Sequence, residues 1–227
     1  PFVRSDFNAA VDEIRQSYIA QGYLDVVVKT PKLEFAEDRS YVDCYIAIQE
    51  GLQYTVSRIE FHGDLIADQT NNLDRIRQEL IGQPYFNRKK LVLQAQVLEV
   101  YGNRGFPDAV VDVRHQDKKN PEQVVLDVFI KSGPLINISA IEILGNQRTR
   151  SSFLKKRIRL KPGDRYDIYL QKESFRNLYK TGIFSKVDFE LKKTDTSESR
   201  VLVVKVQETD SKELFFEPGC GAYEQSR

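Results

Sequence analysis

The chain contains short stretches in which apolar and polar residues alternate and which end at a glycine. This pattern predicts β-strands followed by turns. Four such strands end at Gly51, Gly63, Gly133 and Gly145. Gly51 and Gly133 lie 82 residues apart, and so do Gly63 and Gly145. The same spacing at two independent places indicates an internal repeat.

Between the strands, apolar residues recur at helical spacing and predict two helices in each repeat. The shorter helix is marked by Leu73, Ile76 and Leu80, and again by Phe153, Leu154 and Ile158 after a predicted Thr149 cap. The longer helix is marked by Phe7, Val11, Ile14 and Tyr18, and again by Leu91, Ala95, Leu98 and Tyr101. A tyrosine stands just before a glycine in three places, at Tyr18, Tyr101 and Tyr179, and we expect it to pack the longer helix on the sheet.

Each repeat therefore reads strand, helix, helix, strand, strand. The predicted fold class is α+β, with two helices covering one face of a three-stranded mixed sheet in tandem β-α-α-β-β domains. The predicted domains are a truncated unit at residues 1–51, full units at 52–133 and 134–209, and a terminal segment at 210–227. In the truncated unit, Cys44 is in phase with apolar neighbours and is expected in the core.

Composition and charge exclude several classes of function. Thirty-four basic and 33 acidic residues leave a formal charge of +1, so no strong field exists to attract nucleic acid. The two cysteines cannot by themselves make a disulfide framework or a four-ligand zinc site, and the two histidines, His62 and His115, have no partner at the close spacing of metal ligands. The sequence therefore predicts a folded protein with no cofactor, no metal and no nucleic-acid partner.

In these features the chain resembles the polypeptide-transport-associated (POTRA) domains of the outer-membrane β-barrel assembly family, the BamA and TamA type. The order of elements, the glycine at the end of the first strand and the segment 145–149 (Gly-Asn-Gln-Arg-Thr) carry the resemblance. Segment 178–184 is similar to the junction of helix 2 and strand 2 in the domain nearest the barrel. The motif residues are Gly63, Gly145, Asn146, Arg148, Thr149, Gly182 and Phe184.

The resemblance implies a non-enzymatic periplasmic arm at the cell outer membrane. Such an arm receives unfolded outer-membrane proteins, contacts accessory periplasmic proteins or lipoproteins, and is joined to its own C-terminal membrane β-barrel. Residues 210–227 would then be the linker and the start of that barrel.

In this family the second strand of each domain lies at a sheet edge, whose unpaired backbone groups can accept an extended chain by β-augmentation. The matching segments are 24–29, 109–114 and 187–191. The candidate binding residues are Leu24, Val26, Val28, Ala109, Val111, Val113, Val187, Phe189 and Leu191. Charges expected to guard these edges are Lys29, Arg114, Lys186 and Lys192. A neighbouring unit covering the strands is the alternative interpretation.

Two other functions stay open at this point. One is the periplasmic arm of a two-partner-type secretion pore that exports a cognate protein. The other is a hydrolase or carbohydrate-binding repeat protein, for which Glu60, His62 and Asp64 are the best local cluster of acid, base or metal-binding groups. Their repeat counterparts are Glu142, Leu144 and Asn146, which excludes a site shared by both repeats. A pocket lined by Glu60 and His62 would favour the enzyme.

Overall fold

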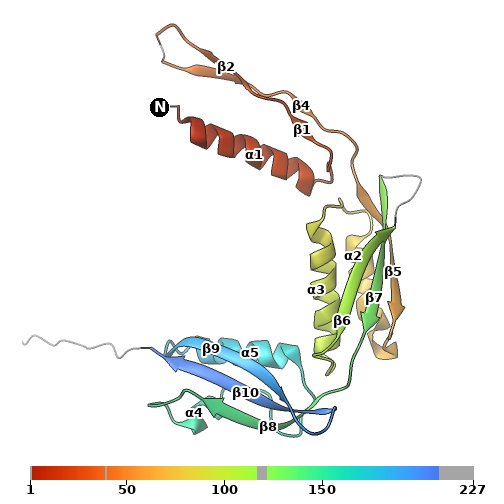
Figure 1. The fold of residues 1–227 in the computed structure, drawn as a ribbon, viewed down its shortest axis with the longest axis vertical. Helices are drawn as coiled ribbons and strands as arrows, with labels where there is room; N and C mark the ends of the chain where they lie inside the picture. Colours follow the sequence, from red (N-terminus) through yellow and green to blue (C-terminus); the bar gives the residue numbers. More distant parts are fainter. Residues whose placement is uncertain (1, 39, 117–121, 210–227) are drawn as a thin grey trace, which may run out of the picture. The chain divides into compact units, whose positions relative to one another are not determined.

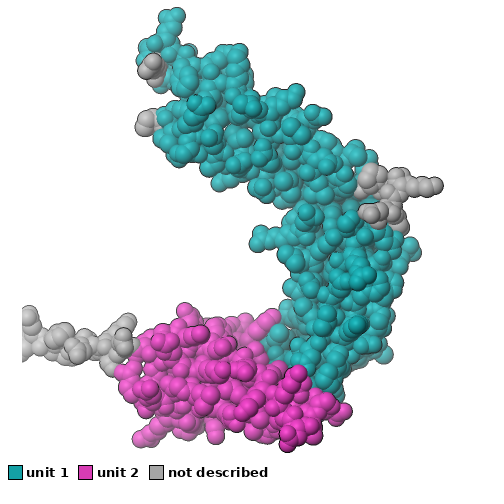
Figure 2. Space-filling model, in the orientation of Figure 1, with its two compact units in different colours: residues 1–137, 165–169 teal, residues 138–164, 170–227 magenta. Residues whose placement is uncertain are grey.

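The computed structural model describes residues 2–38, 40–116 and 122–209, and it divides the chain into two compact units (Figure 2). Unit 1 comprises residues 1–137 and 165–169, and unit 2 comprises residues 138–164 and 170–227. The predicted terminal segment 210–227 lies outside the described residues. Along the described ranges, no helix is both long and apolar enough to cross a bilayer.

Unit 1 contains a three-stranded mixed sheet with two helices on one face (Figure 1). The central strand is β7 (Gln123–Lys131), which pairs in parallel with β5 (Thr55–Gly63) and antiparallel with β6 (Val110–Gln116). Helices α2 (Thr70–Leu80), preceded by the 3₁₀ turn η1 (Ala67–Gln69), and α3 (Arg88–Gly102) connect β5 to β6.

The core of this sheet lies between the strands and the two helices. Ile59 and Leu126 point into it from the sheet, because alternate residues of a strand share one face. Helix α2 contributes Leu73, Ile76 and Leu80, as predicted.

The predicted apolar stripe of α3 was right for Tyr101, which is fully buried, and for Leu98, which packs against the core, but wrong for Leu91 and Ala95, which are exposed. Leu91 is 64% exposed, whereas Leu93 and Val97 are fully buried. The reason is that apolar residues surround most of this helix, so their spacing alone does not select the face that meets the sheet.

Unit 2 repeats the arrangement. Its sheet has the order β8-β10-β9, with β8 (Asn137–Leu144) and β9 (Phe184–Lys193) on either side of β10 (Ser199–Glu208). Helices α4 (Ser151–Lys155) and α5 (Ile168–Tyr179) connect β8 to β9. The predicted α+β class, with two helices on a three-stranded mixed sheet, is confirmed. The Thr149 cap was wrong: Arg150 is the N-cap residue of α4 and makes no side-chain capping bond.

Residues 2–51 form one helix and two short antiparallel strand pairs. The helix is α1 (Arg4–Ala20); β1 (Val27–Val28) pairs with β4 (Ile48–Gln49), and β2 (Lys32–Phe35) pairs with β3 (Val42–Tyr45). The strand predicted at 24–29 is therefore only two residues long. Leu24 lies in the preceding turn and packs against the core of the three-stranded sheet. Cys44 is exposed, contrary to prediction.

Two glycines end the first strand of each complete sheet because the central strand passes very close to them. Gly63 and Gly145 have φ values of +95° and +90°, in the region that favours glycine. A Cβ atom at Gly63 would lie 2.2 Å from the Ile130 carbonyl oxygen, and one at Gly145 would lie 2.0 Å from that of Val206. The repeated glycines are thus required by strand packing as well as by the turn.

We expect Gly63→Ala to cost about 2–4 kcal/mol of unfolding free energy, the sum of a left-handed backbone and a steric clash. Gly82→Ala is the matched control, because Gly82 has a φ of +79° but no atom within 4 Å of the added Cβ. The control should cost only about 1 kcal/mol. Urea denaturation of both variants measures the difference, and equal losses would show that the close approach to Ile130 is unimportant.

Candidate binding edges and the motif loop

Each three-stranded sheet together with its two helices is called a complete domain. The second strand of each complete domain, β6 or β9, lies at an edge of its sheet. Val111 and Val187 are buried, so their side chains face the core and not a partner. What these edges can offer an incoming chain is backbone N–H and C=O groups. The charges Arg114, Lys186 and Lys192 on these strands are exposed.

The β6 edge is partly closed by a side chain of α3. Gln94 Nε2 donates a hydrogen bond of 2.7 Å to the carbonyl oxygen of Val111. In an antiparallel strand the N–H and C=O of one residue point to the same side. The backbone of Val111 therefore faces away from β7, and its carbonyl already has a partner. Ala109 uses its N–H in a local turn with Phe106.

The β9 edge lacks this closure. Gln171 of α5 is the counterpart of Gln94, since it lies 77 residues further on, the same offset that separates Gly105 from Gly182. Within the part of the chain that the structure describes, Gln171 makes no hydrogen bond to Val187. A groove of about 440 Å³ separates α5 from β9 instead. Its lining residues are Gln171, Lys172, Phe175, Arg176, Val187, Asp188 and Phe189.

The backbone groups of β9 that face away from β10 are protected only weakly by intramolecular hydrogen bonds. The N–H of Phe189 donates a 3.0 Å hydrogen bond to Oδ1 of Asp188, an exposed neighbour in the same strand. A side chain of this kind can swing away when another acceptor arrives. Leu191 is half-buried and is not among the residues that line the groove.

The third candidate segment offers little edge. Val26 and Val28 are buried in a small core with Val11. The N–H of Lys29 is bonded to the carbonyl of Ala47 at 2.9 Å, so this strand has its partner within the chain.

The motif residues of unit 2 form a loop that is tied to the end of β10. Asn146 Nδ2 donates to the Thr149 carbonyl at 2.8 Å and to Ser151 Oγ at 3.1 Å. Glu208 accepts from the backbone N–H of Thr149 at 2.8 Å, and from the backbone N–H and Nε of Arg148 at 3.1 and 3.2 Å. Sequence reasoning missed Glu208, because nothing in the spacing links it to a loop about sixty residues earlier.

These bonds act on the charge of Glu208. They stabilise its ionised form, and they lower its pKa from 4.5 to about 2, the backbone N–H of Thr149 being the largest cause. The remaining motif residues end α5 and begin β9: Gly182 has a φ of +68°, and Phe184 is buried.

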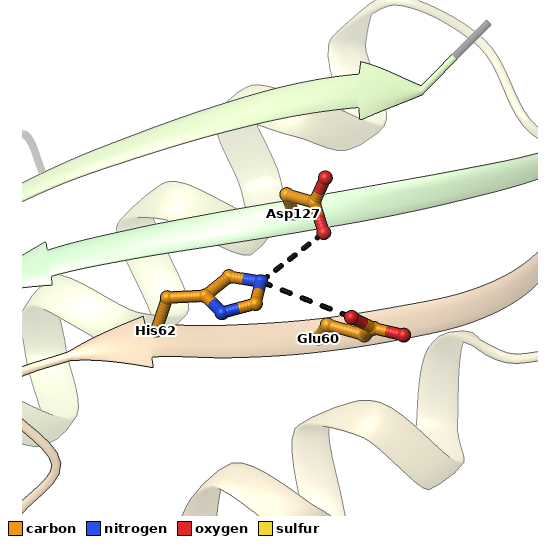
Figure 3. A group of neighbouring side chains, drawn as sticks. All are labelled: Glu60, His62 and Asp127. Carbon is orange, nitrogen blue, oxygen red and sulfur yellow. Dashed lines mark hydrogen bonds and ion pairs between the residues drawn. The ribbon is translucent and has the colours of Figure 1, made fainter.

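The predicted cluster of Glu60, His62 and Asp64 does not form. Glu60 and His62 lie beside Asp127 of β7 (Figure 3). Asp64 instead accepts a 3.0 Å hydrogen bond from the N–H of Ser132. Four cavities in the described part of the chain, one of about 560 Å³ in unit 1, are lined by neither Glu60 nor His62. They give the hydrolase or carbohydrate-binding alternative no support.

Comparison with known proteins finds one matching family model and several similar proteins. Residues 136–209 match the family model POTRA, described as "Surface antigen variable number repeat". The outer membrane protein assembly factor BamA of Nitratidesulfovibrio vulgaris is 29% identical over 90% of this chain, and that of Buchnera aphidicola is 24% identical over 80%. The chain spans only 26% and 29% of the length of these two relatives.

Among solved structures, BamA POTRA domains 3–5 of Haemophilus influenzae give a TM-score of 0.65 at 20% identity, over 89% of this chain and 80% of that one. BamA of Haemophilus ducreyi lacking POTRA domains 1–3 gives 0.61 at 21% identity, over 69% and 30% of the two chains. At this identity the likeness concerns the fold.

Fold and motif loop together define a modular protein built from repeated β-α-α-β-β domains. The comparisons confirm the resemblance seen in the sequence: residues 136–209 match the POTRA family model, and the chain is similar to BamA outer membrane protein assembly factors and, in fold, to BamA POTRA domains. The predicted localisation at the cell outer membrane, on its periplasmic side, is confirmed with it.

The lowered pKa of Glu208 predicts a pH-dependent stability for unit 2. Above about pH 4.5 the carboxylate is ionised in folded and unfolded chains, and its contribution is fully present. As the pH falls toward 2, the unfolded chain takes up the proton first, so the contribution is lost. Urea denaturation of wild type and Glu208→Gln from pH 7 downward should show a wild-type advantage that shrinks below pH 4.5.

Glu198→Gln, at an exposed hairpin position, is the control and should follow the wild type throughout. A difference between wild type and Glu208→Gln that stays constant down to pH 2 would contradict the assignment.

Proposed function

We propose that the chain is the periplasmic substrate-receiving and scaffold arm of an outer-membrane β-barrel protein that assembles or inserts outer-membrane proteins. Its partners would be unfolded outer-membrane proteins, accessory periplasmic proteins or lipoproteins, and its own C-terminal membrane β-barrel. The role is non-catalytic. The observation that supports it most directly is the open β9 edge beside a groove.

The chemistry of this groove suits an extended polypeptide of variable sequence. Edge backbone groups bind any chain through its own N–H and C=O groups, without regard to side chains. Phe175 and Phe189 supply apolar surface for alternate side chains of the bound strand. Lys172 and Arg176 line the same groove and add positive charge. Binding of this kind is sequence-tolerant, which a receptor for many substrates needs.

The two complete domains would not contribute equally. At β6 the carbonyl of Val111 already accepts a hydrogen bond from Gln94, so an incoming strand would have to compete with an intramolecular bond. At β9 the corresponding Gln171 makes no such bond among the described residues. We therefore propose β9 as the main receiving edge and β6 as a weaker one.

The arm of a two-partner-type secretion pore would have the same domain fold. Edge pairing would serve that function too, with one cognate partner in place of many. The number of POTRA domains in the complete protein distinguishes the two, because such pores usually have two domains.

The test is capture of an unfolded outer-membrane protein by the full-length protein in membranes, with a photo-crosslinking residue at exposed position 186. Phe189→Pro removes the outward N–H without removing a bond to β10, and should reduce crosslinking several-fold at unchanged helix content. Phe189→Ala is the matched control: it keeps the N–H and tests the loss of the ring alone.

Val111→Pro on β6 should reduce capture much less than Phe189→Pro, because the Val111 backbone is already engaged. Capture that is equal in the wild type and both proline variants would remove edge pairing at these strands from the proposal.

A further inference from the structure

The helix-free face of the unit 1 sheet carries three side chains with metal-binding atoms that the proposed function does not use. Glu60 and His62 are two residues apart in β5, so both project from the same face. Asp127 is the register partner of Glu60 in the adjacent parallel strand β7. Figure 3 shows the three side chains converging.

The separations between the ligand atoms suit a small metal ion. His62 Nε2 lies 3.2 Å from Asp127 Oδ1 and 3.9 Å from Glu60 Oε2, and all three atoms lie within 4.8 Å of one another. Two ligands of a tetrahedral zinc ion, with bonds of about 2.0–2.1 Å, lie about 3.3 Å apart. Small side-chain rotations would therefore bring the three atoms to coordination distance.

The two carboxylates are held so that one oxygen of each faces the imidazole. Arg58 Nε lies 3.0 Å from Glu60 Oε1, and Gln116 Nε2 donates a 2.6 Å hydrogen bond to Asp127 Oδ2. These contacts use the outer oxygens and direct the inner ones, Oε2 and Oδ1, toward His62. Outer contacts of this kind commonly orient the ligands of metal ions.

The surroundings also limit the freedom of the ligands. The Asp127 side chain is only 12% exposed although it carries an ionisable group. The His62 ring stacks on Phe129, with centroids 5.0 Å apart and planes 23° apart. Ligands that are already ordered lose little conformational freedom when they bind an ion.

We propose that Glu60, His62 and Asp127 form a binding site for a first-row divalent transition-metal ion, with Zn²⁺ as the representative ion. One imidazole nitrogen and two carboxylate oxygens are ligands that zinc accepts, and a fourth position is left for water. The bound ion would join the edge strand β5 to the central strand β7 and so stabilise the sheet.

The site is specific to this domain. In unit 2, Gly145 meets the carbonyl of Val206 as Gly63 meets that of Ile130. Asp127 lies three residues before Ile130, and Val203 lies three residues before Val206, so Val203 takes the position of Asp127. Leu144 precedes Gly145 as His62 precedes Gly63, so Leu144 takes the position of His62. The repeat thus tolerates apolar residues at both positions, which makes His62→Leu a natural variant for a test.

The experiment titrates the 227-residue chain with Zn²⁺ by calorimetry and follows the imidazole nitrogens by NMR. The chain has only two histidines, so each signal is assigned by one substitution. We expect one equivalent of zinc to shift His62 and not His115, and to raise the melting temperature. His62→Leu and Asp127→Asn should each weaken binding at least tenfold, and Gln116→Ala, an outer contact, about tenfold.

His115→Ala is the control and should bind zinc like the wild type. Circular dichroism without metal shows that each variant is folded, and Asp127→Asn, close in shape to the wild type, carries the test if His62→Leu is unfolded. Equal zinc affinity in wild type and Asp127→Asn, or a shift of His115 alone, would overturn the proposal. Equal affinity for Ca²⁺ and Zn²⁺ would do so too, because it would exclude the imidazole as a ligand.

Discussion

A three-stranded sheet pairs the backbone of only its central strand on both sides, and the rest of this structure depends on that constraint. Among the described residues, β7 and β10 have a strand on both sides, whereas each neighbouring strand of the two sheets has a strand on one side only. The two helices of a domain are committed to one face of the sheet, where they cover the core. The function of each domain then depends on what contacts the outward backbone groups of its edge strands: a side chain, solvent or another polypeptide.

The two complete domains meet this constraint differently. Helix α3 has 15 residues and places Gln94 against the β6 edge, where it bonds to the Val111 carbonyl. Helix α5 has 12 residues, and a groove lies between it and β9. The open faces differ as well: the unit 1 sheet carries a histidine between two carboxylates, and the unit 2 sheet has Leu144 and Val203 at two of these positions. One architecture therefore presents two different surfaces.

Errors in the sequence interpretation have identifiable physical causes. Tyr18 and Tyr101 stand four residues before a glycine, but Tyr179 stands three before Gly182. One residue turns a helix by about 100°, so Leu178 takes the buried position and Tyr179 is 56% exposed. In α3 the apolar residues surround most of the helix, and only contact with the sheet selects Leu93 and Val97 over Leu91.

The sequence by itself determined the order of elements, the repeat and the glycines at the ends of the first strands, because each is a local pattern of spacing or backbone conformation. Only the tertiary structure decided which distant side chains meet. It placed Asp127 beside Glu60 and His62 in place of Asp64, and it brought Glu208 to the motif loop. The physical reason is that the pairing of strands brings together residues about sixty or more positions apart, and alternation along one strand carries no information about its partner.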